Sequence, residues 1–197
     1  MKLPLLLIFI TYLFSLSALC QECGIAVSYQ KTDNRYENMV CATAFGEIDL
    51  NPRWSARATV AYNMYYFKEV IEKQGINGTS GRSTTSKGTG SYSMGLGGFY
   101  SLIKEEEHFE VQIGAAASAH TFVPNAILQV WERFYRIEVE VPLILKYRRI
   151  ANSDLGMYVS VAPGRIFGSG KHIEFEADLG KTINKLRFEV GFFYVMD

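Results

Sequence analysis

Residues 135 to 147, YRIEVEVPLILKY, have an apolar side chain at every odd position, while the even positions include Arg136, Glu138, Glu140 and Lys146. Successive side chains of an extended strand point to opposite faces, so this run has one apolar face and one charged face. The same two-residue alternation recurs along the chain, and helical periodicity is nearly absent. We therefore expect an all-β fold, in which the deciding question is which face is inside.

Eight stretches alternate in this way, beginning near Ile25, Val40, Trp54, Tyr92, Phe109, Tyr135, Leu155 and Leu186. The connections at 51–53 and around residues 106 and 152 are short, whereas those at 68–90 and 168–184 are long. A meander places all short turns at one end, which is the asymmetry of outer-membrane barrels. We expect an eight-stranded antiparallel up-and-down transmembrane β-barrel, with residues 172–180 extending the last two strands rather than adding a ninth.

Aromatic residues indicate which face meets the membrane. On alternating strands, Trp54, Tyr100, Phe109, Tyr147 and Tyr194 fall at the short-turn end, and Tyr29, Tyr62, Tyr66, Tyr92 and Tyr135 fall at the other end. Two aromatic girdles on an apolar face are what two membrane interfaces select. The alternative is a secreted lipocalin-like small-molecule binding barrel with its apolar face inside, and a soluble core has no reason for such girdles.

The charged face then lines a narrow lumen. An eight-stranded barrel is just wide enough for side chains to fill it, and buried charges need partners. Setting Leu50 opposite Trp54 puts Glu47 opposite Arg57, and setting Phe109 opposite Tyr147 puts Glu110 opposite Lys146. The predicted lumen ion-pair network comprises Glu47, Arg57, Glu110, Arg136, Glu138, Glu140, Lys146, Arg187 and Glu189. A solvated strand face is the alternative for these residues.

Two further features concern the backbone and the ends of the strands. Pro142 has no amide hydrogen to donate inside a closed sheet, so it predicts a bulge. Cys23 and Cys41 lie near opposite ends of the first hairpin, so we expect no disulfide between them.

The first twenty residues carry one early lysine, an apolar run from Leu3 to Leu16 and small residues before Cys20. This is the shape of a cleaved secretory signal peptide, and the run is shorter than a membrane-spanning helix requires. We therefore expect residues 1–20 to be removed and residues 21–197 to form the barrel. Lipid attachment at Cys20 remains an alternative.

The stretch VPLILKY at 141–147 resembles the "IPLLLKY" strand of the bacterial outer-membrane β-barrel domain family, the porin-family small barrels that include PorT-type proteins. The resemblance implies an eight-stranded barrel in the cell outer membrane of a Gram-negative bacterium, often without an assigned activity. Outer-membrane strands commonly finish on an aromatic residue, and this chain departs from that pattern by ending on Asp197.

Composition and motifs exclude several kinds of site. Twenty acidic residues balance twenty basic ones, so no basic footprint indicates nucleic acid. His108, His120 and His172 lack metal-ligand spacing, and we expect neither a metal nor a cofactor. Ser118 and His120 share one face, so an outer-membrane lipid-modifying enzyme is the catalytic alternative. That hypothesis predicts that Ser118→Ala or His120→Ala abolishes a change in lipid composition; we expect a lumen hydroxyl, a rim histidine and no enzyme.

Function is then expected outside the strands. The 68–90 segment is rich in Gly, Ser and Thr, so we expect a mobile extracellular loop. Such a loop is either simply solvated or contacts a protein or glycan partner. Residues 124–134 either form a short helix or prolong the sixth strand. The sequence predicts an integral outer-membrane barrel with a filled, non-conducting lumen, surrounded by outer-membrane lipid, with a structural or recognition role through extracellular loops.

Overall fold

The computed structural model describes residues 21–32, 36–74, 80–104, 108–122, 135–150, 153–169, 171–172, 177–178 and 183–196. Nearly all of these residues lie in strands. No helix within the described part of the chain has the length and hydropathy needed to cross a membrane. The expected signal peptide at 1–20 and the segment 124–134 lie outside the described residues.

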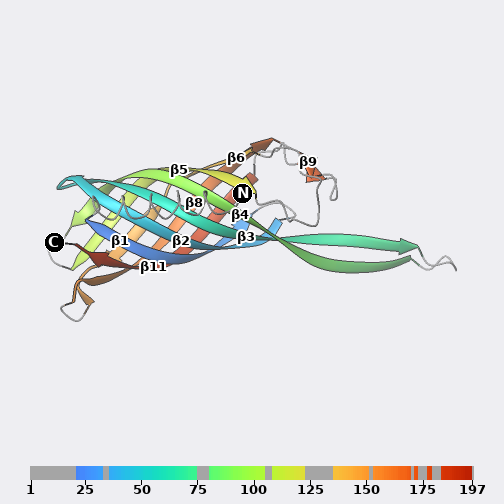
Figure 1. Cartoon of the computed structure of the whole chain (residues 1–197), viewed down its shortest axis with the longest axis horizontal. Coiled ribbons are helices and arrows are strands. Elements are labelled where there is room, and N and C mark those ends of the chain that lie inside the picture. Colours follow the sequence, from blue (N-terminus) through green and yellow to red (C-terminus); the bar gives the residue numbers. More distant parts are fainter. Residues whose placement is uncertain are drawn as a thin grey trace, which may run out of the picture.

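The strands form a closed antiparallel barrel with eight positions (Figure 1). They are β1 (Glu22–Thr32), β2 (Tyr36–Asn51), β3 (Trp54–Gln74), β4 (Ser80–Lys104), β5 (Phe109–Phe122), β6 (Tyr135–Glu140), β7 (Leu143–Tyr147), β8 (Leu155–Ser169) and β11 (Ile183–Val195). β6 and β7 share one position, since both pair with β5 and β8. β11 pairs with β8 on one side and β1 on the other, which closes the sheet and confirms the expected fold class.

The short strands β9 (Lys171–His172) and β10 (Ala177–Asp178) pair with each other. Their register continues that of β8 and β11, because Ile166 lies opposite Ile183 and, further along the same hairpin, His172 lies opposite Ala177. The described residues 171–172 and 177–178 therefore extend the last hairpin beyond the barrel and add no ninth strand to it, as the sequence predicts.

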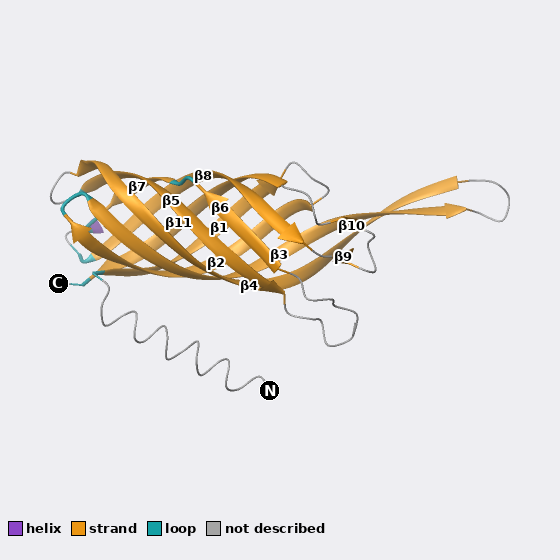
Figure 2. Cartoon of the chain, turned by 90° about the horizontal axis from the view of Figure 1, so that it is seen from above, coloured by secondary structure: helices purple, strands orange, loops and turns teal. Residues whose placement is uncertain are grey.

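The β3–β4 hairpin is the longest in the molecule. Its ladder runs without a break from Trp54 opposite Tyr100 to Gln74 opposite Ser80. The expected irregular loop at 68–90 is therefore wrong over 68–74 and 80–90, because Ser and Thr accept extended backbone and the ladder satisfies its polar groups. The two strands leave the barrel as a twisted ribbon (Figure 1), and Figure 2 shows the C-terminal end at the opposite, short-turn end of the barrel.

Burial shows which face of the sheet is inside. Val139 and Leu143 are 42% and 45% exposed on the outer surface, whereas Glu138 and Lys146 on the same strand position are 3% and 1% exposed. The large exposed hydrophobic side chains occupy alternate positions on the barrel strands, and the buried charged ones occupy the positions between them. The barrel is inside-out relative to a soluble protein, which excludes the lipocalin-like arrangement.

The register agrees with most of the predicted pairs. Glu47 lies opposite Arg57, and Phe109 lies opposite Tyr147. The predicted opposition of Leu50 and Trp54 is wrong by one residue, because an irregularity at the end of β2 places Asn51 opposite Trp54. The Asn51 side-chain oxygen accepts hydrogen bonds from the Arg53 and Trp54 amides, each 2.9 Å long, and this asparagine turn shifts the last pair.

The predicted bulge at Pro142 is also wrong. β6 pairs Glu140 with Ala116 of β5, and β7 pairs Leu143 with Ile113, so the register passes through the proline unshifted. The Pro142 carbonyl still accepts a hydrogen bond of 3.0 Å from the Gly114 amide. A missing donor thus interrupts the strand between β6 and β7 without inserting a residue.

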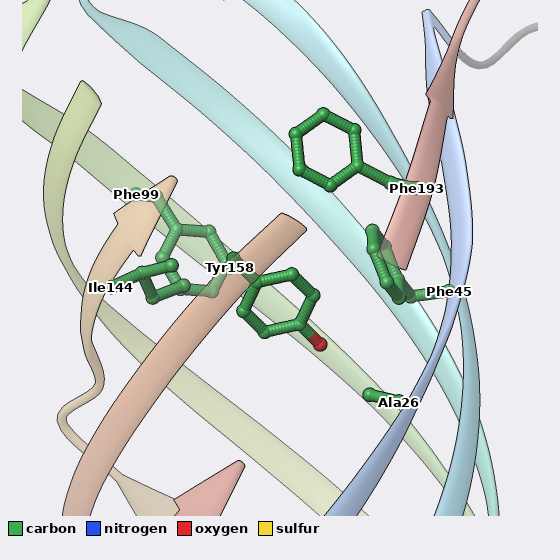
Figure 3. Close-up of a cluster of buried hydrophobic side chains, with 6 residues drawn as sticks. All are labelled: Ala26, Phe45, Phe99, Ile144, Tyr158 and Phe193. Carbon is green, nitrogen blue, oxygen red and sulfur yellow. The ribbon is translucent and has the colours of Figure 1, made fainter. Parts of the chain in front are cut away.

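An apolar cluster lies inside the barrel, which the sequence reasoning missed. It comprises Ala26, Phe45, Phe99, Ile144, Tyr158 and Phe193, whose side chains lie close together in the barrel interior in Figure 3. Inward-facing glycines make room for the rings: a Cβ at Gly156 would collide with the ring of Phe193, and one at Gly114 with that of Phe99. The large inward rings fit because the positions that face them are glycines, which have no side chain.

We expect Gly156→Ala to destabilise the barrel by about 1–3 kcal/mol, because Phe193 must leave its place in a packed interior. Gly98→Ala is the matched control, since a Cβ there meets nothing within 4 Å, and it should change stability by less than about 0.5 kcal/mol. Urea unfolding of both variants in lipid vesicles, followed by tryptophan fluorescence, measures the difference. Equal stability of the two variants would contradict the packing described here.

Candidate functional site

The first lumen cluster is built around two buried glutamates. The Lys146 ammonium lies 2.8 Å from a Glu22 carboxylate oxygen and 2.6 Å from one of Glu47. Arg57 approaches the other Glu47 oxygen at 2.7 Å, and the Ser55 hydroxyl donates to Glu47 over 2.7 Å. Because two cations and a hydroxyl surround it, the Glu47 carboxylate keeps its charge compensated away from water.

Glu110 joins this cluster through a residue that was not predicted. Register places Glu110 opposite Lys146, yet Lys146 turns to Glu22 and Glu47. Arg148 instead bridges Glu22 and Glu110 at 2.6 and 2.8 Å, and Ser101 also donates to Glu110. Arg148 follows the last residue of β7. Beyond the end of a strand, alternation does not indicate whether a side chain points into the lumen, so the sequence did not identify Arg148 as a lumen residue.

The second lumen cluster lies on β6, β8 and β11. Lys185 contacts Glu138 and lies 2.6 Å from a Glu140 oxygen. Arg187 contacts Glu140 and approaches Glu189 at 3.9 Å, and the Tyr158 hydroxyl donates to Glu189 over 2.7 Å. Lys185 was missed, although it shares the inward parity of Arg187 and Glu189. Of the predicted network, the side chain of Arg136 lies outside the described residues; its backbone lies opposite His120.

The aromatic cluster connects the two charged clusters. The Arg57 guanidinium lies 4.5 Å from the ring centre of Phe45, 5.1 Å from that of Phe99 and 5.0 Å from that of Tyr158. Such cation–π contacts stabilise a cation that has lost its water. Tyr158 continues the chain of contacts through its hydroxyl to Glu189. A cavity of about 40 Å³ remains, lined in part by Cys41, Asn63, Ser160 and Arg187.

The catalytic candidates Ser118 and His120 lie together with Glu138 at the inner wall. The Ser118 hydroxyl is 3.3 Å from His120 Nε2, and a Glu138 oxygen is 3.0 Å from the same nitrogen. A serine nucleophile needs the histidine to accept on one ring nitrogen while the acid holds the other. One nitrogen cannot donate to Glu138 and accept from Ser118 together, so this arrangement lacks the geometry of a triad.

The structure describes no metal or disulfide site. Within the described residues, no group of three or more His, Cys, Asp and Glu side chains is placed to hold a metal ion. Cys23 and Cys41 are free thiols: Cys23 lies opposite Gly46, and Cys41 lies opposite Ser28. The two thiols therefore sit at different levels of the first hairpin.

The predicted aromatic residues whose side chains the structure describes lie on the outer face of the barrel at two levels. At the short-turn end, Trp54 packs its ring 5.1 Å from that of Tyr100, and a hydrogen bond of 2.8 Å from Arg53 to the Tyr100 hydroxyl raises the pKa of Arg53. Phe109, Tyr147 and Tyr194 are also outward and exposed at this end. At the ribbon end, Tyr62 and Tyr92 pack 5.2 Å apart and Tyr29 is exposed, whereas the side chains of Tyr66 and Tyr135 lie outside the described residues.

No family model matches the chain, and no curated protein sequence matches it. Among solved structures it is similar to the attachment invasion locus protein Ail of Yersinia pestis in complex with the heparin analogue sucrose octasulfate, at 14% identity over 89% of this chain and 96% of that one, with a TM-score of 0.42. The structure of Ail without that compound is 11% identical over 88% of this chain and 95% of that one, with a TM-score of 0.37. The NanC porin is 8% identical over 88% of this chain and 100% of that one, with a TM-score of 0.29.

At TM-scores below 0.5 these similarities carry no argument about function, so the fold rests on the register and burial of this chain. A closed eight-position barrel has an apolar outer face, two aromatic levels and paired charges inside. Water-exposed proteins do not present such a face, whereas the lipid bilayer selects it. The protein is therefore a transmembrane β-barrel of the outer-membrane type.

We expect Lys146→Met to destabilise the barrel by about 3–5 kcal/mol, because it leaves the Glu22 and Glu47 carboxylates buried with one cation fewer. Lys104→Gln is the matched control, because the Lys104 pair with Asp49 is partly exposed, with side chains 25% and 32% accessible, and should be worth less than about 1 kcal/mol. Both values come from urea unfolding in lipid vesicles. A Lys146→Met variant as stable as Lys104→Gln would contradict this account of the lumen.

Proposed function

We propose that this protein is a sealed outer-membrane barrel that holds the β3–β4 ribbon outside the cell for recognition of a protein or glycan. The observation that carries the proposal is the unbroken β3–β4 ladder, which extends from the girdle residue Tyr62 to Gln74. At about 3.3 Å per residue, those twelve positions of β3 correspond to about 40 Å of strand beyond the girdle. A purely structural barrel needs no such extension.

The free edges of the ribbon support a recognition role. β2 pairs with β3 only as far as Tyr36 opposite Phe67, and β5 pairs with β4 only as far as Phe122 opposite Ser91. Beyond these points, no described strand pairs with either outer edge of the ribbon. Unpaired strand edges offer backbone donors and acceptors to an added strand, and the Ser- and Thr-rich sequence of β4 offers hydroxyl groups to a glycan.

The lumen supports a sealed, non-conducting barrel. Two ion-pair clusters and an aromatic cluster lie in it, and a cavity of about 40 Å³ among them has room for about three water molecules. A continuous aqueous channel needs a wider barrel with more strands. The arrangement of Ser118, His120 and Glu138 around one nitrogen disfavours catalysis, so recognition is proposed in place of an enzymatic role.

In planar lipid bilayers the purified barrel should show no conductance step of porin size, because paired side chains occupy the path of an ion. A matched variant, Phe99→Ala, removes one ring of the lumen cluster and serves to show that a defect in the filling is detectable. A stable porin-sized step from the wild-type protein would contradict the sealed lumen.

Shortening the ribbon should abolish recognition and leave the barrel intact. Replacing residues 70–84 by Asn-Gly joins the opposed pair Glu69 and Thr85 through a two-residue hairpin turn, so the register is kept. Cells that produce the wild-type or shortened protein are compared for adherence to immobilised glycans and proteins, and the heat-dependent gel shift of each protein reports barrel folding. A folded, shortened barrel that adheres like the wild type would contradict the proposal.

A further inference from the structure

The outer face of the barrel contains a shallow apolar groove across β8, β11, β1 and β2, four strands that pair successively with one another. Its volume is about 520 Å³. The outward side chains that line it are five valines and two aromatic rings, namely Val27, Val40, Val159, Val161, Val190, Tyr29 and Phe188. Val27, Val190 and Val159 are direct neighbours across three strands, so short side chains form the middle of the groove.

Two cations lie at the ribbon end of this groove. Lys31 follows Tyr29 on the outward face of β1, and Arg165 follows Val161 and Pro163 on the outward face of β8. Register places Lys31 opposite Leu186 and Arg165 opposite Asn184, both beyond Phe188 on β11. From strand spacing and rise, their Cα atoms are about 12 Å apart, and their long side chains can converge on one anion between them.

Lys31 and Arg165 are charged residues on a largely apolar outer face. The other outward positions of β1 and β8 near the groove carry no charge: they are Val27, Tyr29, Val159, Val161, Pro163 and Phe167. Among the described residues, neither Lys31 nor Arg165 forms an ion pair, although both are exposed. A cation on the lipid face costs free energy toward the bilayer centre and little at the interface, where lipid phosphates lie.

We propose that the groove and the two cations bind one phosphate-bearing membrane lipid, with an acyl chain along the valines and the phosphate between Lys31 and Arg165. Charge complementarity selects the phosphate, and the apolar lining selects the chain. A second protein bound in the groove would need an acidic group beside Lys31 and Arg165, and the experiment below distinguishes this case. The inference rests on the membrane orientation in the proposed function, and its own failure can be told apart from the failure of that orientation.

The experiment is native mass spectrometry of the detergent-purified, folded barrel titrated with single lipids. The probes are dioleoyl phosphatidic acid, dioleoyl phosphatidylcholine with the same chains and a masked phosphate, and inorganic phosphate without chains. The variants are Lys31→Gln with Arg165→Gln, which removes the cations, and Val27→Phe with Val159→Phe, which fills the groove. Arg53→Gln is the matched control, because Arg53 is an exposed cation at the short-turn end.

We expect the wild type and Arg53→Gln to bind one phosphatidic acid about thirtyfold more tightly than phosphatidylcholine, since each cation near a membrane surface contributes about a factor of five. The double glutamine variant should lose this preference, the double phenylalanine variant should bind phosphatidic acid weakly, and inorganic phosphate should bind to none of them.

Equal binding of the two lipids by the wild type, or an undiminished preference in the double glutamine variant, would overturn the proposal. Undiminished binding to the double phenylalanine variant would do the same, as would tight binding of inorganic phosphate, which needs no groove. A barrel that copurifies as a dimer and loses the dimer in the double glutamine variant would favour a second copy instead. A protein that stays monomeric and soluble without detergent would contradict the membrane orientation itself.

Discussion

Closure of the sheet by β1 and β11 is the constraint on which the rest of the structure depends. Eleven consecutive residue pairs join these two strands, from Glu22 opposite Val195 to Thr32 opposite Lys185. A bilayer offers no hydrogen bonds to an open edge, so a sheet that spans it must pair its first strand with its last. Once the sheet is closed, side chains along each strand face lipid and a narrow lumen in alternation. Outward residues must therefore be apolar, and inward charged residues must find partners.

The lumen shows how a closed barrel accommodates charge. Glu47 and Glu140 are buried, and each is paired with two cations. Those of Glu47 come from the neighbouring strand β3 and from β7 across the lumen, whereas both cations of Glu140, Lys185 and Arg187, come from β11. Between the charges lie aromatic rings, which fit because inward glycines such as Gly156 leave space. Ion pairs and rings are thus parts of one packed interior, joined where Arg57 contacts Phe45 and where Tyr158 donates to Glu189.

The ribbon and the outer groove use the two surfaces that closure leaves available. Beyond the barrel, the β3–β4 ladder continues in water, where unpaired edges are tolerated and a partner can reach them. On the lipid side, the β8–β11–β1–β2 sector combines a valine-lined groove with two exposed cations, Lys31 and Arg165, at its ribbon end. The proposed recognition and the proposed lipid binding are compatible, because they involve different strands, β3 and β4 in one case and β8, β11, β1 and β2 in the other.

Alternation and turn length in the sequence alone determined the number of strand positions in the barrel, their order, and that the charged face of the strands is the inner one, because period two and antiparallel pairing are local properties. They also placed Glu47 opposite Arg57 across a short turn. Only the tertiary structure decided that Lys146 pairs with Glu22 and Glu47 rather than with Glu110 beside it, that Phe193 packs over Gly156, and that residues 68–74 and 80–90 remain paired. Those outcomes depend on how strands far apart in sequence meet across the lumen and on how far a ladder continues, which no local pattern specifies.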